Sequence, residues 1–575
     1  MTIGVRRGGV AMLAVWAGIL AGCKSGPAVD SGSPTPAPTF VRGSILRPEG
    51  TTLEDGVVVI EQNRIARVAP AREVNIPSGA AVLGGANSWV IPGLIDAHVH
   101  FFQSGGLYTR PDAIDLRSRV PYAQELERVR STLPETFRRY LRAGITSVVD
   151  FGGPLWNFEV RTLAQQSALA PRVVVAGPLL ASVARPKLDL GDPPIVQVTD
   201  PEKARAIARA LAAHRPDFIK LWWIVPAGGK PEDWLPVGRA AIEEAHGAGL
   251  RVAVHVTELN TTRTAVLAGA NVLVHSVVNA EVDPEFVRLL AERKVPLVTT
   301  LAVFGGYAAV LSRQFRPTAA DMQLASPEVV GTVLDPFESP ENRYPPGLSS
   351  EARRNVRRLW DGGAIVAAGS DAGNIGTFHG SGLHHELELL VESGLTPAEA
   401  LVAATVNAAR VMGRPDLGSI APGQTADLVV LDANPLLDIR NARRITLVIK
   451  DGVAHRPEEI LRPTAADVVQ AQLNAYNARD VEAFLSTYAD DAVVKFASSG
   501  TVLTGKAALR ERYGGLFSRY PKNHARIAER RTEGETVVID HEIITGRAPD
   551  KPDPWDVGWV RYEVSGGLIR RVDLP

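Results

Sequence analysis

The sequence predicts an α/β protein whose main part is a (β/α)8 TIM barrel. Eight short runs rich in valine and isoleucine are separated by segments with helical periodicity, such as residues 201–214 and 234–249. Near-continuous apolar runs are typical of parallel strands that are buried on both faces. Strands that alternate with helices favour a closed barrel, in which the carboxyl ends of all strands open at one mouth.

The predicted strands carry polar side chains at their ends. In order they are WVIPGLIDAHVHF, ITSVVDFG, PRVVVAGPL, DFIKLWW, LRVAVHVT, ANVLVHSV, VPLVTTLAV and GAIVAAGSDA. Six candidate ligands lie at the ends of the first, fourth, fifth, sixth and eighth runs: His98, His100, Lys220, His255, His275 and Asp371. Because a closed barrel brings these ends together, we expect the six side chains to share one site.

Segments on either side of the barrel predict a second, smaller unit. Hydrophobic and polar residues alternate in DGVVVIEQNRIARVAP before the barrel, and in LGSIAPGQTADLVVLDANP and TLVIKDGVAH after it. We therefore expect residues 40–90 and 414–460 to form one split β-sandwich around a barrel of residues 91–413.

Two long connections follow predicted strands, at residues 102–133 and 313–346, and each could form a lid. Tyr307, Arg110 and His379 are candidates to hold a substrate carboxylate or carbonyl group. A packing or surface role explains each of them equally well.

Composition limits the classes of function. The 575 residues are 45% hydrophobic and 22% charged, which is typical of a globular protein with more than one domain. The net charge of -1 gives no electrostatic basis for binding nucleic acid. A small-molecule substrate remains the expected partner.

The N-terminus predicts export and lipidation. Arg6 and Arg7 precede an apolar run at residues 10–20, which is short for a membrane span and typical of a signal peptide over residues 1–23. The following Leu-Ala-Gly-Cys resembles a bacterial lipobox, which implies lipid attachment at Cys23, the only cysteine. The alternatives are an ordinary signal peptide with an incidental cysteine, or a plain thiol in the protein core.

Residues 24–39 are rich in proline, serine and glycine and predict a flexible linker between the membrane and the folded domains. Because Lys24, and not aspartate, follows the cysteine, the resemblance implies the outer membrane facing the periplasm. Attached acyl chains would make this anchoring stable.

The chain resembles the amidohydrolase superfamily over about residues 40–457. The resemblance is carried by PGLIDAHVH at residues 92–100, GSDAG at 369–373, LTPAEAL at 395–401 and APGQTADL at 421–428. The Phe-Ile-Lys strand and the Gly-Ser-Asp-Ala-Gly turn are most similar to imidazolonepropionase-like and prolidase-like metal-dependent hydrolases. The resemblance implies the barrel with its split sandwich.

The six candidate ligands predict two divalent metal ions. His98 and His100 are two apart on a strand and face the same way, so both can bind one cation. Burial would lower the pKa of Lys220 and so favour its neutral amine, which can form a carbamate with carbon dioxide. In the resembling proteins a carboxylated lysine at this motif bridges two metals.

We therefore expect His98, His100 and Asp371 to hold one metal, His255 and His275 the other, and carboxylated Lys220 to link them. Nitrogen and oxygen ligands without cysteine suit zinc, although manganese, iron and cobalt also fit. A snorkelling or salt-bridged lysine is the alternative for Lys220.

This metal site predicts hydrolysis of an amide-like C–N bond in a dipeptide, an N-acyl amino acid or a cyclic amide. A metal-bridging hydroxide would be the nucleophile, with Asp371 as general base and then general acid. One alternative is a lactone or ester hydrolase that uses the same site. Another is a lipoprotein whose barrel is catalytically silent and whose C-terminal domain binds a small molecule.

Residues 464–575 predict a third domain. An amphipathic helix at residues 464–480 is followed by the alternating strands ETVVIDHEIITGR, DVGWVRYEVSGG and LIRRVDL. These segments resemble the SnoaL-like branch of the NTF2-like α+β fold, in which Tyr488, His524, Asp540 and Trp559 would line a pocket. With no acid/base constellation there, we favour an accessory role in ligand binding or homo-oligomer formation over an isomerase.

Overall fold

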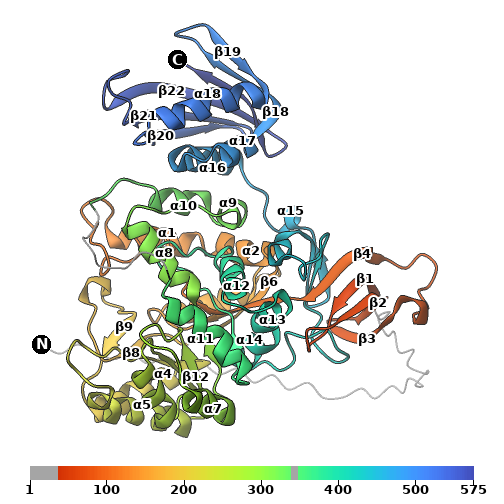
Figure 1. The fold of residues 1–575 in the computed structure, drawn as a ribbon, viewed down its shortest axis with the longest axis vertical. Coiled ribbons are helices and arrows are strands. Elements are labelled where there is room, and N and C mark those ends of the chain that lie inside the picture. Colours follow the sequence, from red (N-terminus) through yellow and green to blue (C-terminus); the bar gives the residue numbers. More distant parts are fainter. Residues whose placement is uncertain (1–36, 339–347) are drawn as a thin grey trace, which may run out of the picture. The chain divides into compact units, whose positions relative to one another are not determined.

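A barrel of eight parallel strands forms the centre of the protein (Figure 1). The computed structural model describes residues 37–338 and 348–575. The barrel strands are β5 (Leu94–Val99), β6 (Ile145–Asp150), β7 (Arg172–Val175), β10 (Phe218–Trp222), β11 (Arg251–His255), β12 (Val272–Val274), β13 (Leu297–Val298) and β14 (Val366–Ala367). Each lies within one of the eight predicted runs, so the predicted barrel is confirmed.

Backbone hydrogen bonds close the barrel at two seams. Strands β5 to β7 form one parallel set and β10 to β14 belong to another. At the first seam the Asp217 amide donates to Val175 O at 2.9 Å. At the second seam, between β5 and the end of β14, the Ala97 amide donates to Ala368 O at 3.1 Å, and the Asp371 amide donates to His98 O at 2.8 Å.

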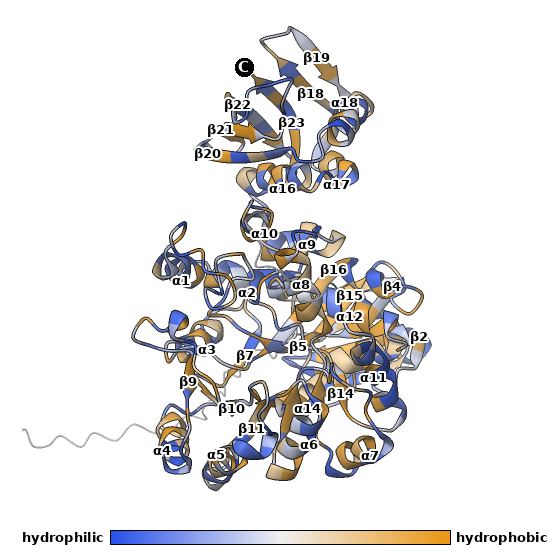
Figure 2. Ribbon diagram, turned by 60° about the vertical axis from the view of Figure 1, so that its left-hand side comes forward, coloured by the Kyte–Doolittle hydropathy of each residue, from blue (hydrophilic) through white to orange (hydrophobic). Residues whose placement is uncertain are grey.

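Helices surround the strands and bury one face each. They are α2 (Leu133–Arg142), α3 (Asn157–Gln165), α4 (Pro201–Ala212), α5 (Leu235–Gly247), α6 (Leu259–Ala268), α7 (Pro284–Arg293), α11 (Ser350–Asp361), α12 (Gly382–Glu392), α13 (Pro397–Val402) and α14 (Ala408–Met412). Helix α11 is largely hydrophilic in Figure 2, yet Val356 and Leu359 on its inner face are buried. Asp283 starts α7 by accepting a hydrogen bond from the Phe286 amide.

The two segments that flank the barrel join in one seven-stranded sheet. Its order is β17-β16-β15-β4-β1-β2-β3, so the three strands that follow the barrel join the four that precede it where β15 pairs with β4. The strands are β1 (Thr39–Leu46), β2 (Thr52–Glu61), β3 (Arg64–Pro70), β4 (Val82–Pro92), β15 (Leu428–Leu431), β16 (Ile445–Lys450) and β17 (Val453–His455). Val58, Val90 and Val430 pack in a single core within this split domain.

The two long connections pack against each other. The first contains α1 (Tyr122–Ser131), and the second contains α9 (Ala319–Leu324) and α10 (Pro327–Val333) after α8 (Leu301–Leu311). Leu107 and Ile114 of the first share a hydrophobic cluster with Phe315, Val330 and Phe337 of the second. We call residues 312–338 the second insertion below.

The C-terminal domain is a six-stranded sheet covered by helices, in agreement with the predicted α+β fold. The sheet order is β19-β18-β23-β22-β21-β20. Its elements are α16 (Ala465–Ala478), α17 (Val481–Ser486), β18 (Tyr488–Phe496), β19 (Thr501–Thr504), α18 (Gly505–Arg519), β20 (His524–Glu533), β21 (Val537–Thr545), β22 (Trp555–Ser565) and β23 (Leu568–Leu574). Its core contains Phe484, Tyr488, Tyr513 and Phe517.

The four residues expected to line a pocket in this domain have different environments. Tyr488 is buried and accepts a hydrogen bond from Gln472, and Asp540 is buried in an ion pair with Arg530. His524 instead contacts Leu334 O of the second insertion, and Trp559 is 38% exposed. The expectation that His524 and Trp559 line an interior pocket therefore fails, because strand alternation turns them away from the core.

The predicted signal peptide, Cys23 and most of the predicted linker lie outside the described residues. Within residues 37–338 and 348–575, no helix combines the length and the apolar character needed to cross a membrane.

Asn355 of α11 fixes the loop that follows β12. Its Nδ2 donates to Val277 O at 3.0 Å and to Ala280 O at 2.9 Å, and its Oδ1 accepts from the Val282 amide at 2.9 Å. We predict that Asn355→Ala lowers the free energy of unfolding by about 3 kcal/mol, because it leaves buried backbone groups unsatisfied. Urea denaturation would measure this, with the exposed Glu292→Gln as control; equal midpoints would contradict it.

Candidate metal centre

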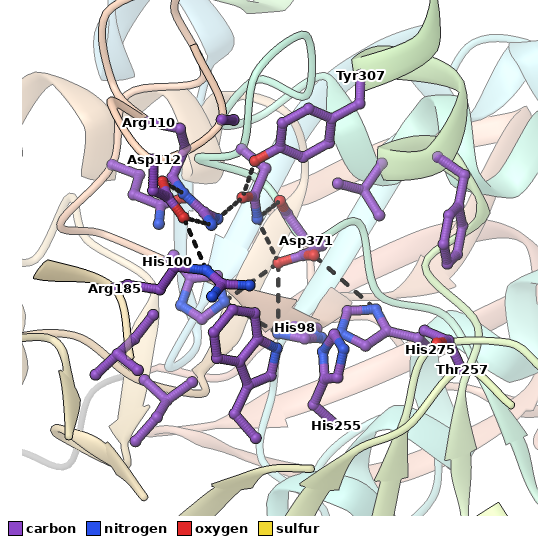
Figure 3. A pocket seen from close by; sticks show the side chains of 18 of the residues that line it. His98, His100, Arg110, Asp112, Arg185, His255, Thr257, His275, Tyr307 and Asp371 are labelled. Carbon is purple, nitrogen blue, oxygen red and sulfur yellow. Dashed lines mark hydrogen bonds and ion pairs between the residues drawn. The ribbon is translucent and has the colours of Figure 1, made fainter. Parts of the chain in front are cut away.

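Three of the six predicted ligands meet at the mouth of the barrel (Figure 3). Asp371 Oδ1 lies 3.4 Å from His98 Nε2 and 3.3 Å from His100 Nε2. The two imidazole nitrogens are 3.3 Å apart. One nitrogen or oxygen atom from each residue can therefore bind the same cation, as expected for a metal held by two histidines and one carboxylate.

Hydrogen bonds to the opposite ring nitrogen orient two of the histidines. His100 Nδ1 lies 2.7 Å from Gly152 O, and because a carbonyl oxygen only accepts, this nitrogen carries the proton. His100 Nε2 is then left with a lone pair that faces Asp371. His275 Nδ1 lies 2.7 Å from Thr300 Oγ1, an arrangement that likewise leaves Nε2 available for a metal.

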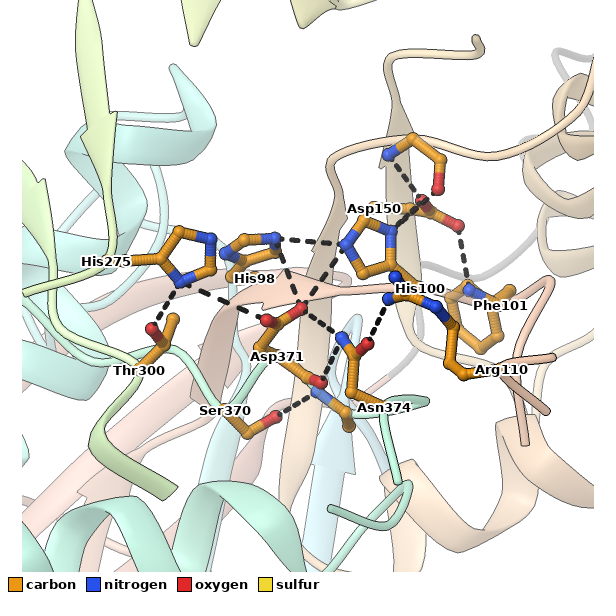
Figure 4. A network of polar contacts seen from close by, with 12 residues as sticks. His98, His100, Phe101, Arg110, Asp150, His275, Thr300, Ser370, Asp371 and Asn374 are labelled. Carbon is orange, nitrogen blue, oxygen red and sulfur yellow. Dashed lines mark hydrogen bonds and ion pairs between the residues drawn. The ribbon is translucent and has the colours of Figure 1, made fainter. Parts of the chain in front are cut away.

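Asp150 holds the loop that presents Gly152 O (Figure 4). It accepts hydrogen bonds from the Phe101 amide at 3.1 Å, the Gly152 amide at 2.9 Å and Asn157 Nδ2 at 2.7 Å. Burial raises the pKa of Asp150 to about 6, although its hydrogen bonds favour the charged form. Asp150, at the end of β6, thus orients His100 indirectly, by fixing the Gly152 backbone whose carbonyl oxygen contacts His100 Nδ1.

Three residues of the centre have left-handed backbone conformations. The φ angles are 82° at His275, 49° at Thr300 and 59° at Asp371. Such values are uncommon for residues other than glycine and concentrate at functional sites. At strand ends they re-aim side chains that a regular strand would direct elsewhere.

Lys220 lies in the same cavity and has an unusual environment. It is 1% exposed, and its Nζ makes no hydrogen bond with any described residue. The ring of Phe151 lies beside it, with its centroid 4.9 Å from Nζ. Burial lowers the pKa of Lys220 to about 7, which favours the neutral amine needed for carbamate formation. Among residues 37–338 and 348–575, no carboxylate forms an ion pair with Lys220.

The remaining histidines complete the cluster. The rings of His255 and His275 are 4.2 Å apart, and those of His98 and His275 are 5.0 Å apart. Burial lowers the pKa of His275 to about 3 and also lowers the pKa values of His98 and His255. Neutral imidazole is the form that binds metals, so this donor set fits divalent cations.

Asn374 joins the centre to two predicted substrate residues. Its Nδ2 donates to Asp371 Oδ1 at 2.8 Å, while its Oδ1 accepts from Arg110 Nη1 at 2.7 Å and from the Tyr307 hydroxyl at 2.8 Å. Arg110 and Tyr307 both line the cavity, and their contact with a substrate stays a prediction. Asn374 was not predicted, although it lies in the turn that contains Asp371.

The cavity above the centre has a volume of about 900 Å³ and an apolar lining with a basic rim. Arg185 stacks on Trp222 at 4.7 Å and lies 3.4 Å from Asp112, which also pairs with Arg110. No sequence pattern indicated Arg185 or Asp112, because they reach the site from irregular loops.

His379 does not line this cavity. Its Nδ1 lies 2.8 Å from the Tyr140 hydroxyl, and its Nε2 lies 2.8 Å from Gln103 O. The ring also stacks on Phe101. Both nitrogens are engaged and the side chain is buried, so this geometry gives His379 a packing role in place of the expected substrate contact.

Comparisons with known proteins agree with the fold of the barrel and of the C-terminal domain. Residues 89–454 match the Amidohydrolase family, and residues 469–572 match the SnoaL-like domain. Imidazolonepropionase from Deinococcus deserti is 27% identical over 416 residues, covering 70% of this chain and 92% of that protein. A putative prolidase from Bifidobacterium longum has a similar structure, with a TM-score of 0.56, 26% identity, and coverage of 76% of this chain and 98% of that one. A Xaa-Pro dipeptidase with bound methionine shares the fold at 21% identity, with a TM-score of 0.55 and coverage of 73% and 100%.

We predict that Thr300→Val weakens metal binding about 10- to 100-fold, because it removes the hydroxyl that orients His275. Thr300→Ser keeps the hydroxyl and should bind metal almost as well as the unaltered protein. Titration with a competing chelator would measure both affinities. Equal affinities for the valine and serine variants would rule out this role of the hydroxyl.

Proposed function

The chain belongs to the amidohydrolase family and is a hydrolase that acts on carbon–nitrogen bonds, and we propose that it does so with two divalent metal ions. The observation that carries this proposal is that four histidines, Asp371 and a buried lysine amine without a hydrogen-bond partner among the described residues line one cavity. A silent binding protein would have no chemical reason to keep this set.

His98, His100 and Asp371 would hold one ion, and His255 and His275 the other. Lys220, carboxylated on Nζ, would bridge them. The donors are nitrogen and oxygen only, which suits zinc. Bound there, the metals would supply Lewis-acid activation of a water nucleophile and of the scissile carbonyl group.

Asp371 is the proton carrier in this proposal. Its Oδ1 already accepts a hydrogen bond from Asn374, and it lies within 3.4 Å of both strand-end histidines. From this position Asp371 would take the proton from the attacking water and deliver it to the leaving nitrogen. Asn374 would keep the carboxylate oriented for both transfers.

The lining of the cavity favours an amide that carries an apolar group and a carboxylate. Phe102, Trp222 and Phe304 supply apolar surface, while Arg110 and Arg185 contribute guanidinium groups of the kind that bind carboxylates. A dipeptide or an N-acyl amino acid has both features, and a cyclic amide with a carboxylate side chain also fits. The prolidase from Bifidobacterium longum and the Xaa-Pro dipeptidase, which have similar structures, accord with this substrate class.

We predict that Lys220→Ala reduces bound metal from about two ions per chain to one or fewer and lowers kcat/KM at least about a thousandfold. Mass spectrometry on protein purified without chelators would count the metals. Dipeptides, N-acyl amino acids, esters and lactones would be assayed as substrates. A preference for esters or lactones would reveal an alternative activity at the same site.

The matched control is Lys203→Ala, an exposed lysine on α4, which should leave metal content and activity unchanged. Asp371→Asn should abolish turnover while the protein remains folded by circular dichroism. Full activity in either Lys220→Ala or Asp371→Asn, or two metals per chain in Lys220→Ala, would contradict the proposed centre.

We also propose that the protein is anchored by a lipid at Cys23 to the outer membrane and faces the periplasm. The support is the basic and apolar N-terminal segment that ends in Leu-Ala-Gly-Cys, together with Lys24 after it. The C-terminal domain would then serve as an accessory module for ligand binding or self-association.

We predict that Cys23→Ser is either released into the soluble fraction or retains its signal peptide uncleaved. The reason is that the residue that would carry the acyl chains is lost. Membrane fractionation with labelled fatty acid would test this. Label that persists in Cys23→Ser would refute attachment at Cys23.

A further inference from the structure

A second cavity lies where the C-terminal domain contacts the second insertion. Its volume is about 450 Å³. Asn474 of α16 donates to Pro327 O of α10 at 2.7 Å beside it, and both figures of the whole fold show these helices as neighbours (Figures 1 and 2). No residue of the candidate metal centre lines this cavity, so it is a separate site.

Four basic side chains line the cavity: Arg313, Arg316, Arg479 and Lys522. None of them forms an ion pair with a residue in the part of the chain that the structure describes. Arg316 donates to the neighbouring Phe315 O, and Arg479 donates to Asn523 O at 2.9 Å. The one acidic residue of the lining, Asp335, accepts a hydrogen bond from the Tyr108 hydroxyl.

The positive charges are close enough to affect one another. Burial and then repulsion from Arg316 lower the pKa of Arg479. Burial is also the main reason that the pKa of His524 is lowered to about 4, and Arg479 and Arg313 lower it further. Because these positive charges disfavour the protonated forms of neighbouring side chains, the electrostatic potential inside the cavity is positive.

Nearby helix ends offset only part of this charge. Helices α8, α10 and α16 end at or next to the cavity, and each carboxyl end carries about half a negative charge. With Asp335 they contribute about -2.5, against +4 from the four basic side chains. The remainder of about +1.5 is opposite in sign and close in magnitude to the charge of a phosphate monoester, about -1.5 to -2 near neutral pH.

We propose that this cavity binds the phosphoryl group of a small molecule. Arginine forks match phosphate oxygens in pairs, and Lys522 adds a compact charge at the rim. The bound group would connect Arg313 and Arg316 of the second insertion to Arg479 and Lys522 of the C-terminal domain. Because α8, which precedes this insertion, carries Phe304 and Tyr307 of the catalytic cavity, the ligand would stabilise one wall of that cavity.

Calorimetric titration of the purified, metal-loaded protein with inorganic phosphate and with glycerol phosphate tests this site. We expect binding that weakens as salt increases. The double variant Arg479→Gln/Lys522→Gln should raise the Kd at least tenfold. The control is Arg288→Gln, which removes one exposed positive charge on α7 that does not line the cavity. This variant should leave the Kd unchanged.

Phosphate bound at the metal centre would persist in the double variant, so only the component lost with Arg479 and Lys522 counts for this cavity. Metal content and Tm without phosphate should be equal in all variants, which excludes a folding defect. No binding of either phosphate compound at millimolar concentration, or equal binding in the double variant and the unaltered protein, would overturn the proposal. A functional metal centre is not required for either result.

Discussion

The backbone pairing between β5 and the end of β14 is the constraint on which the catalytic geometry depends. Asp371 donates its amide to His98 O at 2.8 Å, and His100 donates its amide to Ala372 O at 2.8 Å. These bonds close the barrel and bring a carboxylate to two histidines that precede it by more than 270 positions in sequence. Asp96 strengthens the junction, since its carboxylate accepts the Ser370 amide at 2.9 Å and the Ser370 hydroxyl at 2.5 Å.

Burial gives the site residues their chemical state. A lysine ammonium and protonated imidazoles are costly in a desolvated pocket, so the neutral amine of Lys220 and neutral histidines are favoured. These are the forms that react with carbon dioxide and bind metals. The surrounding barrel must in turn support left-handed conformations at His275, Thr300 and Asp371, which a flexible loop would not maintain.

The peripheral parts of the chain shape access to this centre. Helix α8 places Tyr307 over the cavity, and the second insertion that follows α8 continues to the contact between α10 and α16. Within the C-terminal domain, Phe484 packs on Tyr513 at 4.5 Å and on Tyr488 at 5.0 Å. Aromatic packing of this kind stabilises the core of the domain against which the second insertion packs.

The sequence by itself determined the eight strands, the split flanking domain and the residues that could bind metal, because strand periodicity and ligand chemistry are local properties. It also indicated Arg110 and Tyr307 at the cavity. Tertiary structure alone decided that Thr300 and Gly152 O orient the ligands, that Arg185 reaches the cavity, and that His379 is engaged in packing. These assignments depend on loop conformations and on contacts between distant segments, which no local pattern encodes.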